Sequence, residues 1–76
     1  MFIELTNDKG LPQLINIADI ATVYKESDNT VRITSLSGEQ GVFVGSYEMV
    51  KEYLYDCGCY KVQRLPAEER RTIWNL

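Results

Sequence analysis

Two cysteines, Cys57 and Cys59, flank Gly58 and are the residues with the clearest potential for chemistry. A Cys-x-Cys pair can give two thiolates to a soft metal ion, or it can form a strained redox disulfide. A structural zinc site needs four ligands, and the chain contains no histidine and no third cysteine. In the alternative interpretation, Cys57 packs as a small apolar residue and Cys59 lies just beyond a helix end. We therefore predict no metal site and no cofactor.

The absence of histidine also removes the chemistry of many enzymes. Without it the chain has no Ser-His or Cys-His nucleophile pair and lacks the commonest general base. The glycines are dispersed. They match neither the Gly-x-Gly-x-x-Gly pattern of dinucleotide-binding folds nor the Walker A pattern of phosphate-binding loops. Adjacent carboxylates such as Glu68 and Glu69 are typical of a solvated surface. The sequence thus indicates a protein that is not an enzyme and has no catalytic residues.

The C-terminal segment, residues 60–76, holds the strongest signal for binding. Ile73, Trp74 and Leu76 are large and apolar, and Arg70 and Arg71 precede them by one helical turn. Chain ends are usually polar unless something holds them, and Trp together with Arg is typical of interaction hot spots. We expect this segment to contact a protein partner or another subunit, or to dock on the open face of its own sheet.

Tyrosines form a further group of candidate binding residues. Tyr53 and Tyr55 cannot both share a helix face with Val50 and Leu54, so at least one should be exposed. Exposed aromatic side chains are enriched in binding surfaces because they bring a large area at low entropic cost. We therefore add Tyr55 and Tyr60 to the candidate binding residues. Tyr47 is expected to bury its ring and leave its hydroxyl in water.

Two other functions stay open. A pocket at a subunit interface, lined by Tyr55, Arg64, Arg70 or Arg71, would bind or sequester a small anionic, nucleotide-like ligand. Weak nucleic-acid binding would use the basic tail and its aromatic residues. It is the least favoured because residues 1–59 contain four basic and nine acidic residues, a net charge of −5. Residues 60–76 contain four basic and two acidic residues, so this +2 tail can complement the acidic body.

One small α+β domain should position all these residues, because 76 residues fit a single domain. Apolar and polar residues alternate in segments separated by turns rich in Asn, Asp, Ser and Gly, which predicts an antiparallel β-meander of about five strands. The predicted strands are residues 2–6, 14–17, 20–26, 30–36 and 42–44. Pro12 should stand at a strand start or on a sheet edge, since it cannot donate a hydrogen bond.

One helix is predicted to pack on this sheet. Ser46 is a good N-cap, and Tyr47, Val50, Leu54 and Cys57 follow at helical spacing on one face. Gly58 suits the position that ends the helix. Residues 1–59 then form the sheet-and-helix body. Residues 60–76 belong to the same domain as a basic tail: its first part alternates like a strand, and residues 66–74 resemble a short second helix.

Several segments within residues 1–54 follow a recognisable order, namely Phe2-Ile3-Glu4-Leu5-Thr6, Leu14-Ile15-Asn16-Ile17, Asp28-Asn29-Thr30-Val31-Arg32-Ile33, Val42-Phe43-Val44 and Ser46-Tyr47-Glu48-Met49-Val50. In this order the chain resembles the FlbD-like family of small flagellar-operon proteins and, more distantly, the β-rich core of LytTR-type domains. The resemblance implies a small sheet with a C-terminal helix and no catalytic residues. Similar small proteins occur in phages and prophages. The tail from Cys57 onward departs from the pattern, and the basic residues of a LytTR-like DNA reader are largely missing.

Together these features predict a non-enzymatic protein–protein interaction module. We expect a homo-oligomeric regulator or inhibitor that acts through its C-terminal segment, as a phage or bacterial accessory protein. No apolar run approaches the ~20 residues of a membrane-spanning helix, and no signal peptide follows Met1. The expected location is therefore the cytoplasm, without membrane contact.

Overall fold

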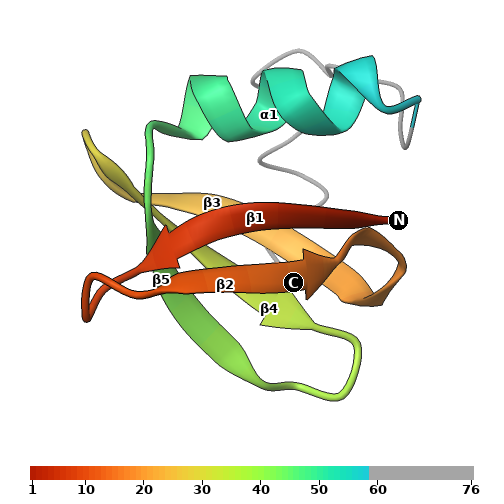
Figure 1. Cartoon of the computed structure of the whole chain (residues 1–76), viewed down its shortest axis with the longest axis horizontal. Helices are drawn as coiled ribbons and strands as arrows, with labels where there is room; N and C mark the ends of the chain where they lie inside the picture. Colours follow the sequence, from red (N-terminus) through yellow and green to blue (C-terminus); the bar gives the residue numbers. More distant parts are fainter. Residues whose placement is uncertain (59–76) are drawn as a thin grey trace, which may run out of the picture.

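The structure is a computed structural model that describes residues 1–58 (Figure 1). The described part forms a five-stranded antiparallel sheet with one α-helix packed against it. In chain order its elements are β1 (Phe2–Asn7), β2 (Pro12–Asn16), the 3-10 helix η1 (Ile17–Asp19), β3 (Ile20–Ser27), β4 (Thr30–Ser35), β5 (Gln40–Val44) and α1 (Tyr47–Asp56). This confirms the predicted α+β fold class. The predicted tail, residues 60–76, lies outside the described residues.

The strand order in the sheet is β2-β1-β5-β4-β3. The last three strands follow one another as a meander, and the β1–β2 hairpin joins them because β1 pairs with β5. Thr6 lies opposite Val44 and Asn7 opposite Phe43 in that pairing. The two edge strands, β2 and β3, are therefore consecutive in the chain, and η1 connects them.

Short-range interactions explain the first hairpin. The Asn7 side-chain oxygen accepts hydrogen bonds from the amides of Lys9 and Leu11, at 3.0 and 3.1 Å. Gly10 has a φ of 82°, which a residue with a side chain rarely adopts. β2 then begins at Pro12, two residues earlier than the sequence analysis predicted. Pro12 is the first residue of an edge strand, where its missing N–H removes no required bond.

The core lies between the sheet and α1. Val31 and Val50 are fully buried, one on β4 and the other on α1. Around them lie four more buried side chains, Leu5, Ile33, Phe43 and Leu54. The partly buried hydrophobic residues at the margin of this cluster are Ile3, Ile15, Ile17, Ile20, Val23 and Tyr47. The position of Tyr47 agrees with the predicted partial burial of its ring.

Helix α1 begins and ends as its sequence predicts. The Ser46 hydroxyl oxygen accepts a hydrogen bond from the Met49 amide at 3.1 Å, which satisfies one unpaired donor of the first turn. Gly58 follows the helix with a φ of 71°, and its amide donates to the Tyr55 carbonyl at 2.9 Å. Cys57 is the exposed C-cap residue. Its predicted packing on the core face is therefore wrong, because the helix ends before its side chain can reach the core.

Strand β5 begins earlier than predicted, at Gln40, and includes Gly41. The Phe43 ring lies directly over Gly41: a Cβ at this glycine would lie 2.9 Å from the nearest ring atom of Phe43. Gly41 therefore belongs to the strand rather than to the preceding turn. Because it has no side chain, it leaves space for the buried Phe43 ring. Glycines in strands often mark such close approaches.

Candidate interaction surfaces

Four large apolar side chains lie on the face of the sheet that points away from α1, and we call this face the outer sheet face. They are Phe2, Leu14, Tyr24 and Val44, with exposed fractions of 60%, 64%, 46% and 50%. Each follows or precedes a residue that packs in or against the core, and successive side chains of a strand point to opposite faces. The outer sheet face is thus defined by the same alternation that builds the core.

Strand register spreads these side chains across the whole sheet. On the β1–β2 hairpin, Leu14 lies opposite Glu4, and Phe2 lies one diagonal step away, opposite Asn16. Val44 on β5 lies next to β1 and β4. Tyr24 lies on the far edge strand, opposite Arg32. The apolar side chains are therefore spread over four strands, and Arg32 on β4 lies between Tyr24 on β3 and strand β5, which holds Val44.

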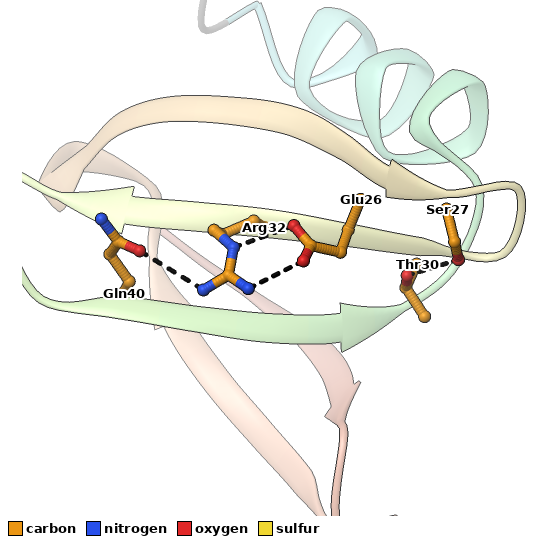
Figure 2. Close-up of polar contacts among 5 residues, drawn as sticks. All are labelled: Glu26, Ser27, Thr30, Arg32 and Gln40. Atoms are coloured by element: carbon orange, nitrogen blue, oxygen red, sulfur yellow. Dashed lines mark hydrogen bonds and ion pairs between the residues drawn. The ribbon is translucent and has the colours of Figure 1, made fainter.

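Arg32 is the middle of a polar cluster on this face, and Figure 2 shows its contacts. Its Nε and Nη2 donate to the two carboxylate oxygens of Glu26 at 2.9 and 2.8 Å, and its Nη1 donates to Gln40 Oε1 at 3.3 Å. These residues come from β4, β3 and β5, so one guanidinium links three neighbouring strands. The fork geometry of a bidentate Arg–carboxylate pair fixes both side chains relative to the sheet.

The Arg32–Glu26 pair is electrostatically self-contained. The hydrogen bonds from Arg32 hold the pKa of Glu26 below its ordinary value, and the same bonds raise the pKa of Arg32. Both groups therefore stay charged and neutralise each other near neutral pH. Arg32 already has an anionic partner, so the pair suits a structural role better than a role in binding a small anion.

A second candidate surface is the side of α1 that faces away from Val50 and Leu54, which we call the α1 outward face. It comprises Glu48, Met49, Glu52, Tyr53, Tyr55 and Asp56. Met49, Tyr53 and Tyr55 have exposed fractions of 40%, 53% and 58%. At the helix margin, Lys51 Nζ lies 3.2 Å from Glu48 Oε2 and 5.6 Å from the centre of the Tyr47 ring.

Only one of the binding residues singled out in the sequence lies in the described part of the chain. Tyr55 is exposed on the α1 outward face, and Tyr53 is exposed as well, whereas the helical spacing predicted that at least one of the two would be. Outside the described residues lie the other candidates, Tyr60, Arg64, Arg70, Arg71, Ile73, Trp74 and Leu76, together with Cys59. The structure therefore does not test whether Tyr55 and the arginines line a common pocket.

The sequence analysis did not identify the outer sheet face or the polar cluster around Arg32. Alternation already indicated which strand residues point away from the core, and it was the available signal for Phe2 and Leu14. The Arg32–Glu26 pair also depends on which residues of β3 and β4 lie opposite each other. The register of that ladder shifts between Lys25 and Ser27, next to Glu26.

Neither a metal site nor a membrane span is found in residues 1–58. No three His, Cys, Asp or Glu side chains in this range gather so that they could hold a metal ion. Of the helices in the same range, none is both long and apolar enough to cross a membrane. What the described residues offer is a pair of exposed, partly apolar faces.

Comparisons with family models, curated proteins and solved structures find no match for this chain. The resemblance to FlbD-like and LytTR-type proteins therefore stays a prediction. Functional arguments have to begin from the two surfaces themselves.

Proposed function

We propose that this protein is a non-enzymatic protein–protein interaction module that forms a homo-oligomer and regulates or inhibits a partner protein. The observation that supports it is the outer sheet face, where Phe2, Leu14, Tyr24 and Val44 are all about half exposed or more. An antiparallel sheet with one open face normally places polar side chains on that face. Large apolar side chains there favour a surface that is covered in an assembly.

The size of the protein supports the same proposal. The described residues bury six hydrophobic side chains, whereas ten large apolar side chains remain exposed. Small domains have a thin stability margin and often gain from a partner subunit. Full burial of a side chain such as Phe2 or Leu14 contributes about 1.5–3 kcal/mol before the entropy of association is subtracted.

The Arg32–Glu26 pair makes covering this face feasible. Burying a charge without a partner is strongly unfavourable, and the guanidinium and carboxylate already satisfy each other at 2.8 and 2.9 Å. A second protein surface can therefore cover this pair without supplying a countercharge. We further propose that the protein acts in the cytoplasm as a phage or bacterial accessory protein.

Sedimentation equilibrium of the full chain tests this function. We expect an average mass above the 8.7 kDa of one chain, increasing with protein concentration. Leu14→Lys should shift the mass toward that of one chain, because it places a charge on the outer sheet face. The new lysine lies opposite Glu4, so the fold should tolerate it.

Leu11→Lys is the matched control. Leu11 is 58% exposed but lies in the β1–β2 turn rather than on the outer sheet face. It should associate like the wild-type chain. A wild-type chain that stays at 8.7 kDa over the whole concentration range would contradict self-association. Equal masses for the Leu14 and Leu11 variants would show that the outer sheet face is not the contact.

A further inference from the structure

The α1 outward face presents an apolar strip beside an acidic strip. Met49 and Tyr53 are four residues apart and so lie one above the other, and Glu52 and Asp56 form a neighbouring row at the same spacing. We propose that the basic C-terminal segment of the same chain, residues 60–76, docks on this face. This contact within one chain goes beyond the proposed function, which concerns contacts between chains.

The apolar strip has a defined position. The Met49 side chain lies against the turn between β5 and α1, where a Cβ at Gly45 would be 2.7 Å from Met49 Cε. Tyr53 follows one turn later and is 53% exposed. A thioether beside an aromatic ring forms a favourable site for another large apolar or aromatic group. Trp74, with Ile73 as its neighbour, supplies such a group in the segment.

Charge complementarity selects the segment as the occupant. Glu48 already has a cation nearby, because Lys51 Nζ lies 3.2 Å from its carboxylate. Glu52 and Asp56 add two negative charges beside the apolar strip. In the segment, Arg70 and Arg71 stand four and three residues before Trp74. The α1 outward face thus has two negative charges next to large apolar groups. The segment has two positive charges next to large apolar groups, so the two charge pairs have opposite sign.

The connection allows this contact within one chain. Gly58 adopts a positive φ of 71° directly after the helix, a conformation that commonly turns the chain back at a helix C-terminus. Residues 59–69 can span about 35 Å when extended, and the helix of ten residues is about 15 Å long. A short tether gives an effective concentration on the order of millimolar, which favours a site on the same chain over one on another.

Trp74 reports directly on this docking because it is the only tryptophan of the chain. We expect the full-length protein to show blue-shifted Trp emission and weak quenching by acrylamide, both independent of protein concentration. The double variant Glu52→Arg and Asp56→Arg should shift the emission to the red and increase quenching. The matched control, Asp19→Arg and Glu39→Arg, changes the net charge equally in exposed positions away from α1, and should leave both signals unchanged.

A charge-reversal experiment completes the test. Arg70→Glu with Arg71→Glu should give the same red shift, and combining these changes with Glu52→Arg and Asp56→Arg in one chain should restore the blue-shifted emission. Far-UV circular dichroism would confirm that each variant is folded. Wild-type emission typical of a fully exposed tryptophan, or no change in the Glu52 and Asp56 variant, would overturn the docking.

Two results would overturn docking within one chain even if the surfaces do meet. One is emission that shifts to the red on dilution. The other is restoration of the blue-shifted emission when the two separately reversed variants are mixed, because that requires contact between different molecules. Neither result bears on Leu14, so this docking and the proposed self-association through the outer sheet face can fail independently.

Discussion

Arg32 shows how a single side chain shapes the outer sheet face. Its guanidinium bonds to Glu26 from β3 and to Gln40 from β5, while Arg32 itself belongs to the strand between them. Ion pairs at the surface contribute little to stability because water and salt screen them. The main effect of these contacts is therefore geometric: they fix a charge-neutral pair and Gln40 relative to three neighbouring strands.

The pH dependence of the free energy of unfolding in acid should reveal the stabilising effect of the Arg32–Glu26 pair. Since the folded-state pKa of Glu26 is lowered from 4.5, its contribution is present above about pH 4.5 and is lost as the pH falls through the folded-state pKa. Arg32→Gln should move the Glu26 pKa back toward 4.5 and make the loss of stability in acid less steep. An NMR titration of the Glu26 carboxyl carbon measures this directly. An unchanged Glu26 midpoint in the Arg32→Gln variant would show that Arg32 does not stabilise the carboxylate in solution.

Helix α1 connects the core to the second candidate surface. Val50 and Leu54 hold it on the sheet, while Met49 and Tyr53 remain exposed on its other side. A helix of ten residues is only marginally stable by itself, so packing and capping determine whether it forms. Any change in its first turn therefore affects both the core and the α1 outward face.

Removal of the N-cap should weaken α1 by a known amount. Ser46→Ala deletes the hydroxyl oxygen that accepts the Met49 amide at 3.1 Å, and should lower the free energy of unfolding by about 1 kcal/mol. Ser46→Asp keeps an acceptor at the same position and should stay close to wild type. Urea unfolding followed by circular dichroism measures both. A Ser46→Ala variant as stable as wild type would exclude this cap as a stabilising contact.

At the scale of the whole molecule, the pairing of β1 with β5 joins the β1–β2 hairpin to the meander of β3, β4 and β5. It places β1 and β5 in the interior of the sheet, beside β4, and leaves β2 and β3 as edges. Edge strands invite association with other chains unless they are irregular or contain proline. Pro12 begins β2, and the β3–β4 ladder has two register shifts, so both edges have such features. Association through the faces is therefore favoured over association through the edges.

Hydrogen exchange should follow this strand order. We expect the amides of Val42 and Phe43 on β5 to exchange most slowly, because β5 is paired on both sides and its centre is buried. The amides of Leu14 on β2 and Thr22 on β3 should exchange faster, since these strands are paired on one side in the described sheet. NMR exchange rates under native conditions provide the measurement. Slower exchange at Leu14 than at Phe43 would contradict the strand order.

Local sequence determined most of the elements of the described part. Alternation defined the strands to within a few residues, Asn7 and Gly10 specified the first turn, and Ser46 and Gly58 bounded the helix. All of these features depend on interactions between residues close in the chain. That is why the fold class, and the exposure of at least one of Tyr53 and Tyr55, could be predicted from the sequence.

Tertiary structure alone decided which strands meet and what their faces present. The pairing of β1 with β5 joins residues about 38 positions apart, so no short-range pattern specifies it. The Arg32–Glu26 pair joins side chains of two strands beside a register shift, and the Phe43 ring lies over Gly41 within β5. The two apolar faces result from burial shared among distant segments, and burial is a property of the packed chain rather than of any one segment.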